Sequence, residues 1–277
     1  NIAHKGDRII MAATDKPYYE SVALQSERHC GGALGPFVID GGGAILDGSR
    51  PIPPEFWKHY LGPIYQLPVR KRGPQQMLFL DGKPLPRVEF DLDHATDLPP
   101  MHWGYYQGSI YLRIEKQTLP EDYQLSLAWH NAGLTLYHVH DVIITGLIAQ
   151  GYQLDGINVN DKVDRCLISN STCRGNGRSG IAVAGSSRAI IQECLLGDNG
   201  EAQLWVEGET IVDVIDSELL PASAPRLVNH GGRVNVDPPF PDDANDAAGN
   251  ENGQDNPGAA DADAADDNAA DDAADDN

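Results

Sequence analysis

Three stretches of the sequence repeat one pattern: DVIITGLIAQGYQLDGINV at residues 141–159, VDRCLISNSTCRGNGRSGIAV at 163–183 and AIIQECLLGDNGEAQLWV at 189–206. Each has spaced apolar residues, then a polar turn rich in glycine or asparagine, then a short strand of alternating polarity. A fourth, weaker copy ends in APRLVN at 224–229. Repeats of this kind favour a solenoid, in which each coil buries its apolar face only against the next coil.

The first apolar residue of each closing strand gives the period of the repeat. These residues are Ile157, Ile181, Leu204 and Leu227, and they follow one another at intervals of 24, 23 and 23. A period of about 23 residues with short strands and no helix fits one coil of a β-solenoid, and the consensus of leucine-rich repeats is absent. We therefore expect an all-β fold, a parallel β-helix built as a single-stranded solenoid.

The apolar residues that open each repeat also align between coils. This alignment sets Val163 opposite Ile191 and Cys166 opposite Cys194, with both cysteines pointing inward. A ladder of small buried side chains is the favoured interpretation. A disulfide is the alternative, since the coil spacing of about 4.8 Å permits one.

The rest of the chain divides by composition. Residues 1–50 contain short alternating strands and are expected to form the first coils, whereas 51–120 are rich in proline and aromatic residues and predict an inserted β subdomain. The main coils are expected at 121–236. Residues 237–277 hold 14 acidic residues and no lysine or arginine, and so little apolar surface predicts a disordered acidic tail.

The charge is uneven and excludes some functions. The chain carries a net charge of −21, but residues 1–236 carry only −7, and no basic face for nucleic acid is expected. No apolar run is long enough for a membrane span. The four cysteines have no CxxC spacing, which argues against a zinc or redox site. We expect a monomer, secreted or at the cell surface, although the sequence shows no signal peptide.

The repeated strings resemble the right-handed β-helix, or pectate-lyase-like, superfamily, whose coils carry a V-x-I-x-x-C-x-I strand pair, an Asn/Gly turn and a strand with a Gly-Ile pair. The resemblance covers about residues 1–50 and 121–236. It implies a carbohydrate-active protein with a polysaccharide groove along the Gly-Ile strands, acting as a glycoside hydrolase or a uronate lyase or epimerase. The alternative is a non-catalytic module that binds glycan or serves at the cell surface, because fold alone does not decide function.

Strand alternation places one set of side chains outside on the Gly-Ile strands. Asn158 and Asn160 on one coil and Trp205 and Glu207 on another are the candidates to contact substrate. An exposed indole can stack on a sugar ring. Packing of Trp205 against a turn or the insertion is an equally weighted alternative.

The catalytic candidates are Asp155, Asp161 and Glu207. Asp155 lies in LDGI, which resembles the N-T-D-G-I motif of polygalacturonase-like hydrolases, but the other motifs of that family are missing, and a turn aspartate is the favoured alternative. Asp155 and Glu207 are expected too far apart to act together, whereas Asp161 and Glu207 at about 10 Å reach the range of inverting glycosidases. A partner from the insertion, such as Asp91, is the remaining option.

Cations cluster near Arg174 and Arg178. In the alignment above, 18 residues separate Val163 from Ile181, against 13 in the neighbouring coils, and the excess predicts a cationic loop beside the groove. Such a loop would bind an anionic glycan, and ordinary solvated charge is the favoured alternative. The HxH pair His138 and His140 offers a base or two metal ligands, but no third ligand, so no metal site is expected. No cofactor is implied, and calcium is left open.

Overall fold

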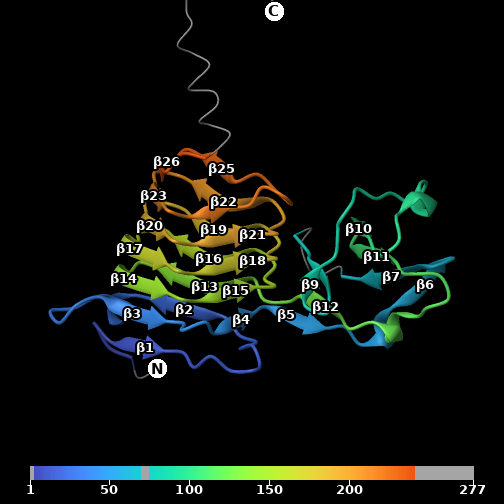
Figure 1. The fold of residues 1–277 in the computed structure, drawn as a ribbon, viewed down its shortest axis with the longest axis horizontal. Coiled ribbons are helices and arrows are strands. Elements are labelled where there is room, and N and C mark those ends of the chain that lie inside the picture. The colour runs from blue at the N-terminus through green and yellow to red at the C-terminus, as the bar shows by residue number, and fades with distance from the viewer. Residues whose placement is uncertain (1–2, 70–74, 241–277) are drawn as a thin grey trace, which may run out of the picture. The chain divides into compact units, whose positions relative to one another are not determined.

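The computed structural model describes residues 3–69 and 75–240 (Figure 1). Of these, residues 3–69 and 75–238 belong to one compact unit. Most of the expected acidic tail, from residue 241 onward, lies outside the described residues. The described part is all β, and its helices are single turns of 3-10 helix. These turns are η1 (Glu27–His29), η2 (Pro54–Phe56), η3 (Ala95–Asp97) and η4 (Pro120–Asp122).

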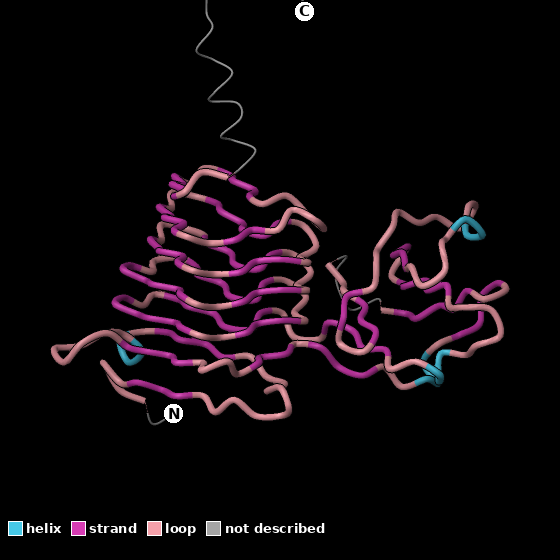
Figure 2. Tube along the Cα trace, in the orientation of Figure 1, coloured by secondary structure: helices cyan, strands magenta, loops and turns pink. Residues whose placement is uncertain are grey.

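Three parallel sheets make up the predicted β-helix, and each full coil contributes one strand to each sheet (Figures 1 and 2). The expected solenoid is therefore confirmed. The six-stranded sheet holds β2 (Val22–Gln25), β13 (Ala132–Tyr137), β16 (Asp155–Asn160), β19 (Ser179–Val183), β22 (Ala202–Glu207) and β25 (Leu227–His230). The seven-stranded sheet holds β1 (Arg8–Ile10), β3 (Phe37–Asp40), β14 (His140–Thr145), β17 (Asp164–Ser169), β20 (Arg188–Gln192), β23 (Ile211–Ile215) and β26 (Arg233–Asp237). The five-stranded sheet holds β4 (Ile45–Asp47), β15 (Ile148–Gln150), β18 (Thr172–Arg174), β21 (Leu195–Gly197) and β24 (Glu218–Leu219).

The register of the six-stranded sheet follows the period of the sequence. Ile157 lies opposite Ile181, which lies opposite Leu204, which in turn lies opposite Leu227. The first three of these side chains are at most 1% exposed. Stacked aliphatic side chains thus fill the core from coil to coil, as burial of their apolar surface requires.

One coil differs from the alignment expected from the sequence. Cys166 lies opposite Ala189, and Ile168 lies opposite Ile191, so the expected match of Cys166 with Cys194 is wrong. The equivalent of Cys194 is Ser171, one position before the Thr172–Leu195 pair. The alignment expected from the sequence began this coil at Val163, whereas the residue equivalent to Ile144 and Ile191 is Ile168, and Ser171 then fills the inward position. Its hydroxyl accepts a hydrogen bond from the backbone N–H of Leu147 and donates one to the carbonyl of Ser169, so burial leaves it satisfied.

All four cysteines (Cys30, Cys166, Cys173 and Cys194) are buried free thiols. Burial raises the pKa of Cys166 to about 12 and that of Cys194 to about 11. Since the thiolate is the reactive form, neither should react in the folded protein at pH 8. We expect Ellman's reagent to detect about four thiols per chain in denaturant without reductant, and far fewer before unfolding. A count of only two thiols per chain in denaturant would instead show that two of the cysteines form a disulfide.

Left-handed residues turn the chain at the corners. The corner after the six-stranded sheet uses His138, Asp161, Gly185, Gly208 and Gly231 in successive coils, all with positive φ. A Cβ on Gly208 would lie 2.6 Å from the carbonyl oxygen of Gly185. Glycine is needed there for close stacking as well as for backbone conformation.

A buried asparagine ladder supports the corner before the six-stranded sheet. Asn176 accepts a hydrogen bond from the backbone N–H of Tyr152, and Asn199 accepts two from Asn176. Asn199 in turn donates to Gln203. This ladder explains the asparagine in the polar turns of the repeat, because buried turn backbone needs polar partners.

Two antiparallel sheets lie between β4 and β13 in the chain. The first orders its strands β5-β12-β8-β9 and the second β10-β11-β7-β6. Trp103, Ile110 and Leu112 are fully buried in the core of this segment. The strands are β5 (Ser49–Pro51), β6 (Lys58–Leu61), β7 (Ile64–Pro68), β8 (Leu78–Leu80), β9 (Lys83–Pro84), β10 (Trp103–Tyr106), β11 (Ser109–Arg113) and β12 (Leu125–Ala128). We call residues 48–131 the insertion; it begins and ends with the paired strands β5 and β12.

Candidate functional site

The outer face of the six-stranded sheet carries most of the side chains that the sequence singled out. Asn158, Ala182 and Trp205 are equivalent positions in successive coils. Asn160 follows Val159 and Glu207 follows Val206, and these two valines are equivalent positions two coils apart. Glu207 lies opposite His230 in the next coil. The face therefore presents Trp205, Glu207 and His230 at one end and the asparagines nearer the other.

Asp155 begins β16 and is fully buried. Its two carboxylate oxygens accept hydrogen bonds from Arg178 at 2.9 and 2.6 Å, in a bidentate ion pair between adjacent coils. Ser179 and Asn158 each donate one more, at 2.7 Å. With four hydrogen-bond donors around it and no exposed surface, this carboxylate has no open side for a substrate. The same donors supply the partners that a buried charge requires.

Trp205 is half-buried between side chains of the adjoining coils. The guanidinium of Arg178 lies 5.4 Å from the centre of the indole, and the imidazole of His230 lies 5.0 Å from it at an angle of 56°. The indole N–H donates to Glu207 at 3.0 Å. These contacts hold the ring in place but leave less of its face for a sugar than an isolated surface indole would.

The structure brings Asp161 together with His138 from the coil before it. Both are about half-exposed at the corner of the coils, and their side chains form an ion pair if the histidine is protonated. The imidazole also stacks on Tyr137, with ring centres 4.3 Å apart. His140 instead contacts Asp141 at 2.8 Å, so the two histidines of the HxH pair have separate partners. Among residues 3–69 and 75–240, no three His, Cys, Asp or Glu side chains cluster as a metal site would require.

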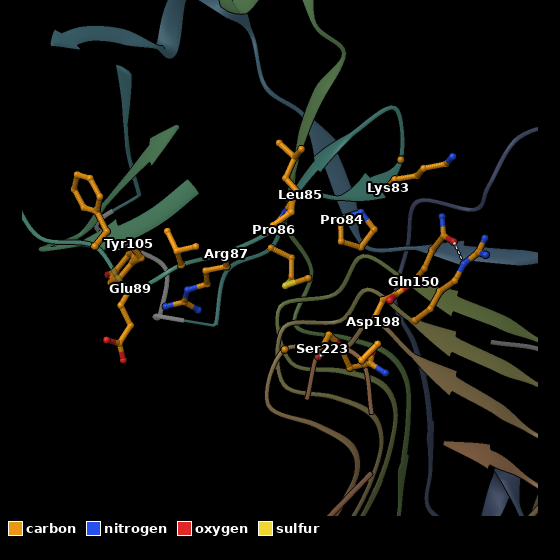
Figure 3. A pocket seen from close by; sticks show the side chains of 18 of the residues that line it. Lys83, Pro84, Leu85, Pro86, Arg87, Glu89, Tyr105, Gln150, Asp198 and Ser223 are labelled. Carbon is orange, nitrogen blue, oxygen red and sulfur yellow. Dashed lines mark hydrogen bonds between the residues drawn. The ribbon is translucent and has the colours of Figure 1, made fainter. Parts of the chain in front are cut away.

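A large cleft lies where the insertion faces the corners of the coils (Figure 3). Its volume is about 1660 Å³. Lys83, Arg87 and Tyr105 line it from the insertion, and Gln150 and Asp198 from the coils. Figure 3 shows Arg87 and Tyr105 on one side of the space and Gln150 and Asp198 on the other, with Lys83 toward the side of Gln150.

Arg174 lies in this cleft and not on the sheet face. It is exposed at the end of β18, and its Nε donates to Gln150 at 3.1 Å. The two arginines proposed to form one cationic loop are thus on different surfaces. The loop itself is wrong as well, because the correct register leaves 13 residues between Ile168 and Ile181, the same as in the neighbouring coils.

The cleft has carboxylates on both walls. Asp81, Glu89 and Asp91 line it from the insertion and Asp198 from the coils. The backbone N–H and the imidazole of His94 both contact Asp91, and these contacts hold the pKa of its carboxyl below the usual range. Sequence analysis suggested Asp91 but not Lys83, Arg87 or Tyr105, because only the packing of the insertion beside the coils makes them part of one site.

A comparison with family models supports the fold. A family model described as right handed beta helix region matches residues 124–220, and the coils are those of a right-handed β-helix. No curated protein matches the chain. A solved structure titled "The complex structure of XylC with xylose" is similar at 12% identity and a TM-score of 0.40, covering 84% of this chain and 63% of that one. The chain thus spans less than two thirds of that protein, and so low a score carries no argument about function.

Proposed function

We propose that this β-helix protein binds polysaccharide in the cleft between the insertion and the coils. The observation that carries the proposal is the cleft itself, about 1660 Å³ with mixed charged, amide and aromatic groups on two walls. That volume exceeds the typical pocket for a small molecule and suits several units of a polymer. Tyr105 offers a ring for stacking, while Lys83 and Arg174 offer donors for hydroxyl or carboxylate groups.

The outer face of the six-stranded sheet is proposed as a continuation of this site. Gly200 lines the cleft, and the next residue, Glu201, interacts electrostatically with both Arg87 and Arg178. Arg178 in turn contacts Trp205. Asn158, Asn160 and Trp205 then serve as secondary contacts of a chain that leaves the cleft around this corner. Such a polymer ligand agrees with the expected location outside the cell.

Cleavage of the bound polymer is the second candidate function. The carboxylates on opposite walls favour it, since glycosidases use two carboxyl groups that flank the bond to be broken. We place Asp198, with Asp91 as its partner, ahead of Asp155, Asp161 and Glu207, because Asp198 and Asp91 line the cleft and the other three do not. Asp155 is also fully buried.

A panel of neutral and anionic polysaccharides tests both functions. Affinity electrophoresis reports binding, absorbance at 235 nm reports unsaturated uronates, and reducing ends report hydrolysis. We expect the double variant Lys83→Ala with Arg174→Ala to weaken binding of an anionic polysaccharide about tenfold, as the loss of two exposed charge contacts implies.

The matched control is Lys162→Ala with Arg188→Ala, which removes two exposed cations that do not line the cleft. Equal retention of both double variants would exclude the cleft as the binding site. If the protein releases reducing ends or unsaturated uronates and the Asp198→Asn variant does not, the protein is an enzyme that cleaves the bound polymer.

A further inference from the structure

A second cavity lies in the insertion and differs in chemistry from the cleft. Its volume is about 380 Å³, within the usual range of sites for small molecules. Phe56, Leu67, Leu127 and Trp129 line it, together with three prolines. Leu67 and Leu127 belong to the main core of the insertion, so the floor of the cavity is fixed by packing.

Arg50 is the charged residue among those that line this cavity. It is exposed, and its guanidinium lies 4.5 Å from the centre of the Trp129 ring. No carboxylate pairs with Arg50 within the part of the chain that the structure describes. Its N–H groups at the mouth of an apolar cavity are therefore available to a negatively charged group of a ligand.

We propose that this cavity binds a small aromatic carboxylate, with its ring in the apolar cavity and its carboxylate on Arg50. Charge complementarity selects an anion, because Arg50 is a cation beside a cavity that is otherwise apolar. The walls select a ring over an alkyl chain. Pro51, Pro53 and Pro68 present rigid rings, and a planar ligand loses less conformational entropy on binding than a chain does. This site is separate from the cleft and does not depend on polysaccharide binding.

Calorimetric titration with 2-naphthoate tests the proposal. We expect one site per chain and a Kd of about 0.1–1 mM, as the ligand efficiency of a molecule this size implies. Arg50→Gln should weaken 2-naphthoate about tenfold, the loss typical of a charge-assisted hydrogen bond, and should leave the uncharged 2-naphthylmethanol unchanged.

Phe56→Ala should weaken both compounds, since it removes one wall of the cavity. Phe56 is 57% exposed, and the control Leu61→Ala removes a side chain that is 48% exposed and does not line the cavity. Circular dichroism spectra matching the parent chain establish that each variant is folded. Absence of binding, equal affinity of the Arg50→Gln variant, or tighter binding of octanoate than of 2-naphthoate would each overturn the proposal.

Discussion

Replacing Asp155 by alanine should lower the free energy of unfolding by about 3 to 5 kcal/mol, because it leaves the largely buried Arg178 without its anion. The pair is bidentate, and the Arg178 side chain is only 22% exposed. Ser179 and Asn158 lose an acceptor at the same time. Urea unfolding followed by circular dichroism measures the effect.

Two further variants separate the cause from general damage. Asp164→Ala removes a surface ion pair whose side chains are 39% and 60% exposed, and should cost less than about 1 kcal/mol. Adding Arg178→Met to Asp155→Ala should recover part of the stability, because it removes the unpaired cation. An Asp155→Ala protein as stable as the Asp164→Ala protein would refute the structural role, and a catalytic Asp155 would then need to be reconsidered.

Tyr152→Ala should cost a similar amount, about 3 to 5 kcal/mol, because it opens a cavity in the core. The side chain is fully buried. Its ring fills the space beside Gly48 and Gly133, where an added Cβ would lie 2.3 and 2.7 Å from ring atoms. Its hydroxyl donates to the carbonyl oxygen of Glu20 at 2.7 Å. One side chain thus joins the first coil to the chain on both sides of the insertion.

Tyr152→Phe keeps the ring and loses the hydrogen bond, so it should cost only about 1 kcal/mol. Tyr137→Ala is the control, since that tyrosine is 44% exposed. Thermal unfolding ranks the three variants, and limited proteolysis should show earlier cleavage within residues 3–47 of the Tyr152→Ala protein. A Tyr152→Ala protein as stable as the control would show that the first coil is held by other contacts.

The fold could be predicted because the deciding residues are local and periodic. Ile157, Ile181 and Leu204 recur with one coil between them, and only a stacked solenoid gives them a common core. The prediction failed in a single coil, where the polar Ser171 is buried and its hydroxyl bonds to the backbone. The sequence of that coil was aligned out of register, and the apparent extra residues were interpreted as a cationic loop. The structure has no such extra residues.

The site was harder to predict because its contacts are between distant parts of the chain. Alternation placed Trp205 outside but could not show that Arg178 and His230 flank it. The LDGI motif fits an aspartate paired with a largely buried arginine as well as it fits a catalytic aspartate, so the motif alone could not decide the role of Asp155. Lys83 and Gln150 both line the cleft, and no pattern in the sequence links positions so far apart.

The place where the insertion enters the coils also bears on how such a protein can change. In three other coils four residues (151–154, 175–178 and 198–201) join the five-stranded sheet to the six-stranded one, and in the last coil seven (220–226) do so, whereas 84 residues lie between Asp47 and Ala132. Because Ser49 pairs with Ala128, the two ends of this long segment meet one strand spacing apart. The insertion therefore leaves and re-enters the coil at neighbouring points, as a hairpin does, whatever the length of the insertion. The entropic cost of closing a longer segment grows slowly. That corner is an acceptor position, at which one recognition module could be exchanged for another while the scaffold stays the same.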